Sequence, residues 1–158
     1  MAVTDANPDS FTRMDESTAE QWAHIGERTF ANQGRVADRL MMLLESLAEI
    51  SDGFITDQLT HCLQTATMAE KAGADDEMVF GALMHDVGKA ISVPNHGAIS
   101  AEMIQPYVRE DVYLAIKNHQ DFQGMHYYGH FGAPTDLRHT KYDSSEPWWQ
   151  LCATFTDD

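Results

Sequence analysis

Apolar residues recur three or four positions apart along most of this chain, which is the spacing of one face of an α-helix. The pattern predicts a first helix over about 18–30, opened by a capping box at Ser17-Thr18-Ala19-Glu20. A second helix follows Gly34 and ends before Asp52-Gly53. Its apolar stripe is the clearest in the chain: Val36, Leu40, Leu43, Leu44, Leu47 and Ile50.

Two more helices are predicted before residue 90. Thr56 can cap a third helix, which Gly73 ends. Asp75 or Asp76 can cap a fourth helix, in which apolar residues again follow helical spacing.

Proline residues divide the second half of the chain. Pro94 precedes a predicted fifth helix over about 97–105, and Pro106 separates it from a sixth over about 108–119. A loop over 120–144 is rich in aromatic residues, histidine and glycine, and we expect it to pack as a lid.

Ser145 is expected to cap a last helix with Pro147 in its first turn. No segment shows the clean alternation of a pair of strands. The predicted fold class is therefore all-α, with an N-terminal arm over 1–16 and a single domain over 17–158.

The composition excludes several classes of function. Lys and Arg number 10 against 25 Asp and Glu, a net charge of −15, so a nucleic acid or an anionic membrane is not an expected partner. No apolar run approaches the ~20 residues that span a bilayer. Two cysteines, Cys62 and Cys152, make no disulfide framework, and we expect buried free thiols in a reducing cytoplasm.

Candidate metal ligands are spread over the middle helices. His61 lies on the third helix, His85-Asp86 at the end of the fourth, His96 at the fifth and His119 at the end of the sixth. Metal sites in helical bundles are built in this way, from side chains on facing helices. Imidazoles with a carboxylate suit iron, manganese, zinc or nickel better than calcium. Two ions that share Asp86 would use all five ligands.

These residues resemble the HD-domain metalloprotein superfamily, a helical bundle with one or two metals in its core. The resemblance covers about 55–125. The stretch 58–66, Gln-Leu-Thr-His-Cys-Leu-Gln-Thr-Ala, is similar to the HD oxygenases that cleave the carbon–phosphorus bond of hydroxyphosphonates. Asn118-His119-Gln120 is similar to their relative, myo-inositol oxygenase.

The resemblance implies a cofactor of two iron ions, one ferrous and one ferric, with Asp86 as the bridging ligand. One or two manganese, zinc or nickel ions are the alternative. It also implies that Lys89 contacts substrate and takes part in catalysis; the alternative is a cation at a helix C-terminus, favoured there by the helix dipole. The metal ligands that it implies are His61, His85, Asp86, His96 and His119.

The family's last ligand is an aspartate near the end of a C-terminal helix. Asp157 is the predicted counterpart, with Asp158 or a later residue as alternatives. The tyrosine and glutamate that gate the iron of the phosphonate-cleaving enzymes are replaced here by Ser51 and Phe54. In the loop, Arg138 could bind a phosphonate or phosphate in bidentate fashion or form a surface salt bridge.

The sequence thus predicts a di-iron oxygenase whose partners are dioxygen and a small hydroxylated substrate, for which a 1-hydroxyphosphonate is one option. The alternative is a metal-dependent phosphohydrolase acting on a nucleotide or another phosphate ester, since residues 96–102 are similar to that branch. A third reading is a metal-storing or regulatory module without turnover.

Overall fold

The computed structural model describes residues 11–157, and the chain divides into two compact units, Met1–Met41 and Met42–Asp158. The first unit contains a 3-10 turn, η1 (Met14–Glu16), helix α1 (Ala19–Gln33) and the start of α2 (Val36–Ser46). Part of the predicted arm over 1–16 therefore forms a turn, whereas residues 1–10 lie outside the described residues. The single domain over 17–158 stays a prediction.

The capping box of α1 lies one residue later than expected. The Thr18 hydroxyl accepts from the Gln21 N–H at 3.3 Å, and the Thr18 N–H donates to the Gln21 side chain at 2.9 Å. A capping box accepts glutamine as well as glutamate at the third helical position, so Thr18 and Gln21 can form it. Ser17 then lies outside the box and bonds elsewhere. Its hydroxyl donates to the Met14 carbonyl and accepts from the Trp22 indole.

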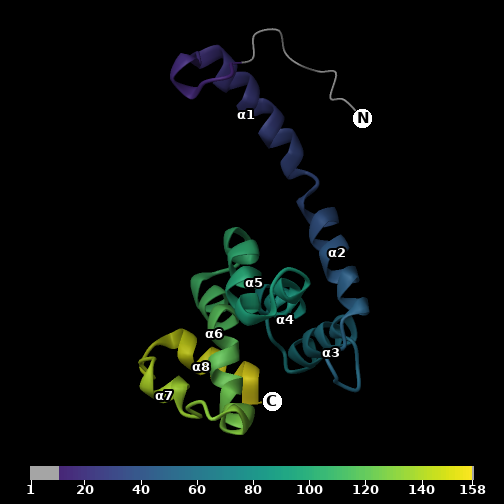
Figure 1. Cartoon of the computed structure of the whole chain (residues 1–158), viewed down its shortest axis with the longest axis vertical. Coiled ribbons are helices and arrows are strands. Elements are labelled where there is room, and N and C mark those ends of the chain that lie inside the picture. The colour runs from purple at the N-terminus through teal and green to yellow at the C-terminus, as the bar shows by residue number, and fades with distance from the viewer. Residues whose placement is uncertain (1–10, 158) are drawn as a thin grey trace. The chain divides into compact units, whose positions relative to one another are not determined.

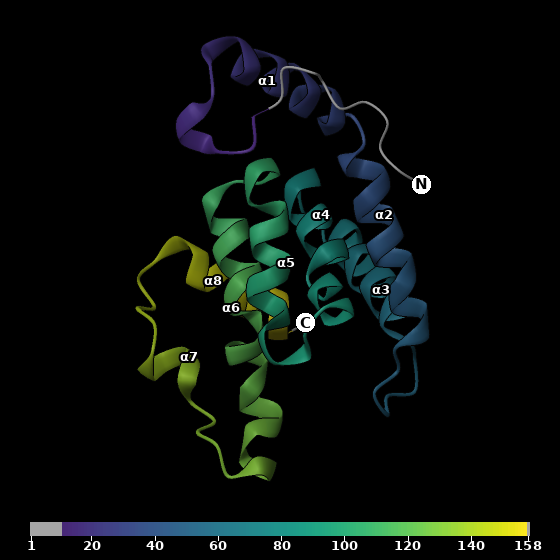
Figure 2. The ribbon, with the colours of Figure 1, turned by 45° about the horizontal axis from the view of Figure 1, so that its top comes forward.

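The described residues of the second unit form helices joined by turns, with no strand among them (Figures 1 and 2). After α2 and the turn η2 (Leu47–Glu49), its elements are α3 (Gln58–Lys71), α4 (Asp76–Met84), η3 (Val87–Ala90), η4 (Val93–Asn95), α5 (His96–Ile104), η5 (Gln105–Tyr107), α6 (Glu110–Tyr127), η6 (Tyr128–Phe131), α7 (Leu137–Thr140) and α8 (Pro147–Asp157). This confirms the all-α class. Within the described part of the chain, no helix is long and apolar enough to cross a membrane.

Helix α6 is the element around which this unit is arranged. It packs against α5 and against α8, while α3 packs against α4 (Figure 2). Most of the residues that α6 buries follow helical spacing along one stripe: Val112, Ala115, Ile116, His119 and Phe122. A single helix therefore carries both the apolar contacts of the core and one of the candidate metal ligands.

Three predicted boundaries are wrong. Helix α6 does not end at residue 119 but continues to Tyr127, so 120–144 is not one loop. The extra turns form because Phe122 continues the buried stripe. Asp57, and not Thr56, caps α3, and its carboxylate accepts from the Thr60 N–H at 2.8 Å. Helix α8 begins at Pro147, two residues after Ser145.

Residue 145 has another role in the structure. The backbone N–H and the hydroxyl of Ser145 both donate to the carboxylate of Asp143, at 2.9 and 2.8 Å. These bonds close a turn just before the helix begins, whereas a capping side chain would bond into the helix itself.

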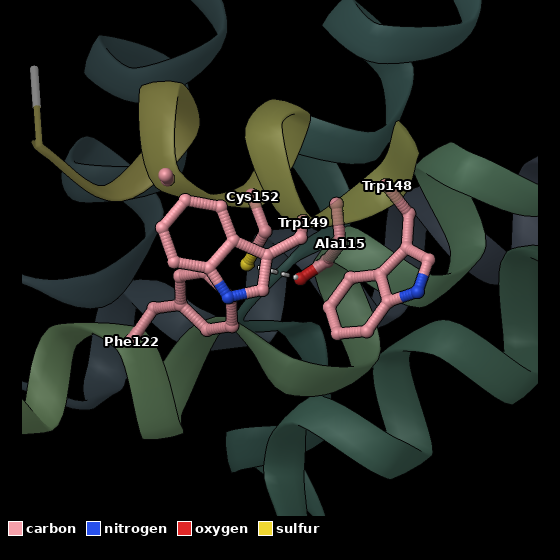
Figure 3. Close-up of a cluster of buried hydrophobic side chains, with 6 residues drawn as sticks. Ala115, Phe122, Trp148, Trp149 and Cys152 are labelled. Atoms are coloured by element: carbon pink, nitrogen blue, oxygen red, sulfur yellow. Dashed lines mark hydrogen bonds between the residues drawn. The ribbon is translucent and has the colours of Figure 1, made fainter. Parts of the chain in front are cut away.

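An aromatic cluster joins α6 to α8 (Figure 3). The ring of Phe122 is fully buried, 5.4 Å from the ring of Trp149 and 6.0 Å from that of Trp148. The Cys152 thiol donates to the Ala115 carbonyl at 3.3 Å. Both cysteines are buried and free, as expected, and burial raises the pKa of Cys62 to about 12.

The segment around α7 is tied to α6 by polar contacts. Asp121 accepts from the Lys141 ammonium at 2.7 Å and from the Tyr142 hydroxyl at 2.6 Å. Burial alone would raise the pKa of the Asp121 carboxyl, but these donors hold it below its ordinary value. The segment is thus a packed connection between α6 and α8.

We expect Phe122→Ala to lower the free energy of unfolding by about 3–5 kcal/mol, because it leaves a cavity between α6 and α8. Phe131, which is 79% exposed, is the matched control. Phe131→Ala should change stability by less than about 0.5 kcal/mol. Urea denaturation of the two variants measures the difference. Equal losses in both variants would contradict this assignment of the core.

Candidate metal centre

The five predicted ligands come together in the core of the second unit. His61 projects from the first turns of α3, and His96 is the first residue of α5. His85 and Asp86 lie where α4 ends and η3 begins, and His119 lies on the buried stripe of α6. The structure therefore brings all five residues together, and their role as metal ligands stays a prediction.

A close approach of backbone segments brings α5 to the centre. A Cβ at Gly88 would collide with the carbonyl of His96, so only glycine lets η3 lie directly against the start of α5. The Gly88 N–H donates to the Ser100 hydroxyl at 2.9 Å, which fixes this contact. The glycine after the His-Asp pair is thus the residue that lets His96 reach Asp86.

The ligand atoms form two groups, one on each oxygen of Asp86. In the first, the Nε2 atoms of His61 and His85 lie 3.1 Å apart, and 3.4 and 3.3 Å from Asp86 Oδ2. In the second, the Nε2 atoms of His96 and His119 lie 3.1 Å apart, and 3.0 and 3.5 Å from Asp86 Oδ1. Each group could hold one cation, with Asp86 between the two.

Backbone carbonyls fix the orientation of three imidazoles. The Nδ1 atoms of His85, His96 and His119 lie 2.8, 2.7 and 2.6 Å from the carbonyls of Ala82, Val93 and Ile116, respectively. A carbonyl can only accept, so each Nδ1 donates and each Nε2 of a neutral ring carries a lone pair. Metal-bound histidines commonly donate their other ring N–H to a carbonyl in this way.

In the second group, this orientation of the rings points two imidazole nitrogens at each other. The lone pairs of His96 Nε2 and His119 Nε2 face each other, with no proton between them when both rings are neutral. Burial lowers the pKa of His119, which favours its neutral form. A cation between the two nitrogens would turn this repulsion into coordination.

Asp86 is buried and remains ionised. Burial alone would raise its pKa, but the surrounding imidazoles of His85, His119 and His61 hold the pKa well below its usual range. Among the described residues, Asp86 Oδ1 is a buried side-chain oxygen without a hydrogen-bond partner. Buried carboxylate oxygens normally have a partner, so the donor set fits a metal ion at this position.

Lys89 lies beside the first group. Its ammonium donates to Asp86 Oδ2 at 2.7 Å and to the Gln58 side chain at 2.8 Å. Gln58 is a buried polar residue at the start of α3. The amide holds the lysine in place, and the lysine directs a positive charge toward the cavity that both residues line.

The centre opens to solvent on the side of His61. The side chain of His61 is 37% exposed, whereas those of the other four ligands are at most 6% exposed. Two cavities, of about 710 and 330 Å³, both include His61 in their walls. A ligand from solvent would therefore meet the first group and not the second.

Two other predicted site residues lie elsewhere. Arg138 donates to Asp157 at 2.7 Å and lies over the ring of Trp149, and it lines neither of these two cavities. Asp157 thus belongs to a salt bridge and is not one of the grouped ligands. Asp158, the alternative, lies outside the described residues. Their roles as substrate and metal contacts stay predictions.

Helix α8 nevertheless reaches the centre through other residues. The ring of Phe155 lies edge-on to His85 at 5.5 Å and to His119 at 6.4 Å. Thr156 lines both cavities, as does Gln123 of α6. Sequence reasoning missed Thr156 and Gln123, because neither stands in a motif and only the packing of α8 on α6 brings them here.

The fold and the grouped residues define a class: an all-α protein whose core contains His and Asp groups that could hold one or two cations. A sequence model of the HD domain matches residues 59–144, more than half of the chain. The chain belongs to the HD domain family, whose members are generally metal-dependent enzymes. No curated protein matches it.

We expect Asp86→Asn to abolish binding at both cation positions, because both groups share this carboxylate. His61→Ala should remove one ion and leave the other, which has its own two imidazoles. His130→Gln, a change at an exposed histidine outside both groups, should bind as the unchanged protein does. Metal content per chain after equilibrium dialysis measures this, with circular dichroism to verify folding. Retention of two ions by Asp86→Asn would refute the bridging role.

Proposed function

We propose that this protein is an HD-family di-iron oxygenase that acts on a small hydroxylated substrate. The observation that carries the proposal is the division of the Asp86 carboxylate between two pairs of imidazoles. Such a bridging carboxylate suits a dinuclear centre better than a single ion. The similarity of residues 58–66 to the carbon–phosphorus-cleaving oxygenases supports the choice of reaction.

Two iron ions in different oxidation states would supply the capacity to bind and reduce dioxygen. His61, His85, His96, His119 and Asp86 would hold them. The carbonyls behind three of these rings keep each Nε2 lone pair aimed inward, so little reorganisation is needed on loading. Phe155 packs edge-on against two of the rings.

Lys89 would orient the substrate. Its side chain is 15% exposed, and its ammonium is already held by Asp86 and Gln58, so it offers a fixed positive charge at the edge of the smaller cavity. An oxyanion of the substrate, such as a phosphonate, can bind there. Its hydroxylated carbon would then face the partly exposed first group.

A metal-dependent phosphohydrolase is the second candidate. The HD domain match favours it, since metal-dependent hydrolysis of phosphate esters is typical of this family. In that reaction a metal ion generates hydroxide and polarises the phosphorus. Lys89 would then bind the phosphate that is attacked. The net charge of −15 disfavours a polyanionic nucleotide over a substrate with one compact anion.

Anaerobically purified and iron-loaded protein distinguishes the candidates. The oxygenase proposal expects two irons per chain, a mixed-valent electron paramagnetic signal, and oxygen consumption with a 1-hydroxyphosphonate or a polyol. The hydrolase alternative expects phosphate release from nucleotides or simple phosphate esters in the absence of oxygen. Full metal occupancy with neither activity would favour a storage or regulatory module and would overturn the oxygenase proposal.

Lys89→Gln should lower kcat/KM by about tenfold to a hundredfold, because it removes a hydrogen bond from a charged donor to the substrate. Metal content should be unchanged, since the ammonium is not a ligand. Lys117→Gln is the matched control, as Lys117 is a lysine of α6 that pairs with Glu102 away from the centre. Steady-state kinetics and metal analysis of both variants test this. A loss of metal in Lys89→Gln would instead make the lysine a structural part of the centre.

A further inference from the structure

The two cavities meet at the candidate centre and differ in chemistry. His61, Gln123 and Thr156 line both, so the cavities share one wall beside the most exposed ligand. His85 also lines the larger cavity. A molecule bound at the first group could therefore extend into both spaces at once.

The smaller cavity, of about 330 Å³, has a cation and several polar groups in its wall, although much of that wall is apolar, as at Phe54. Lys89 lies in its wall, held by Gln58, and His126 from the end of α6 adds an imidazole. Thr56 and Tyr127 contribute hydroxyl groups. These donors suit a compact oxyanion.

The larger cavity, of about 710 Å³, is mainly apolar. Met68 and Ala69 of α3, Met78 of α4, and Leu151 and Phe155 of α8 form its walls. Its charged lining residue among those described is Lys71, which is exposed in the last turn of α3. Cavities of this size and lining bind uncharged apolar groups.

The distribution of acidic residues agrees with an oxyanion in the smaller cavity and an apolar group in the larger one. The chain has 25 Asp and Glu, yet none of the described residues that line either cavity is acidic. In such an acidic protein, walls without carboxylates avoid repulsion of an anionic ligand. They also avoid the cost of burying a charge against an apolar group.

From these observations we propose that the substrate is amphipathic: a hydroxylated acid whose oxyanion lies by Lys89 and His126 and whose uncharged alkyl or aryl group fills the larger cavity. This inference rests on the proposed function for the hydroxylated carbon at the centre. It adds a class of substrate, since a small polar polyol would leave the larger cavity unused. The shared chemistry of the head is a single oxyanion, carboxylate or phosphonate.

Binding of two homologous series to the iron-loaded full chain, measured by calorimetry without oxygen, tests the proposal. One series is the straight-chain 1-hydroxyalkylphosphonates from ethyl to octyl, and the other is the 2-hydroxycarboxylic acids of the same lengths. Each added methylene should lower Kd about two- to fourfold, because it is buried wholly or in part against apolar walls. The series that binds more tightly at equal length identifies the head group.

Two pairs of variants locate the alkyl end and the oxyanion end of the bound molecule. Met68→Glu places a carboxylate in the wall of the larger cavity and should abolish the dependence on chain length, whereas Met68→Leu should keep it. Met68 is 53% exposed, so both variants should fold. His126→Gln should weaken every member of the better series by a similar factor, and His130→Gln, at an exposed histidine that lines neither cavity, should not.

A Kd that is independent of chain length, or that rises with it, would overturn the proposal while the two irons and the oxygenase function stand. A dependence that survives Met68→Glu would also overturn it, because the alkyl group would then lie elsewhere. If the protein binds no metal but keeps the dependence on chain length, the proposed function fails and the amphipathic site stands.

Discussion

The centre of this protein depends on one buried carboxylate. Asp86 lies in the core with an imidazole pair on each of its oxygens, and it stays ionised although burial opposes its charge. Positive charge must lie close to such a group. Lys89 supplies part of it at Oδ2, whereas Oδ1 has no hydrogen-bond partner among the described residues. The geometry of the surrounding helices follows from the need to place donors around this carboxylate.

Apolar packing provides the rigid frame for these polar groups. Phe122 and the tryptophans of α8 fasten α8 to α6, and this contact brings Phe155 against two of the histidine rings. Gly88 allows α5 to approach η3 closely enough for His96 to reach Asp86. The same helices that bury the aromatic cluster therefore define the cavities.

Much of this could be predicted from the sequence, for reasons that are local. The spacing of apolar residues predicted the helices, because amphipathic periodicity reflects the face that each helix buries. The adjacent His85 and Asp86 followed by a glycine, with single histidines on the neighbouring helices, indicated a core metal site. The boundaries were less accurate. The N-caps of α1 and α3 are Thr18 and Asp57, each one residue after the predicted cap. Several short polar side chains in a row can each serve as a cap, so the sequence does not single one out.

By itself, the sequence determined which side chains are available to hold a cation, namely His61, His85, Asp86, His96 and His119. Only the tertiary structure decided how they divide into two groups on the two oxygens of Asp86, because that division depends on the crossing of α3, α4, α5 and α6. It also decided that Arg138 pairs with Asp157, and that Gln58, Gln123 and Thr156 line the cavities. Such contacts arise between residues far apart in the chain, and no local pattern encodes them.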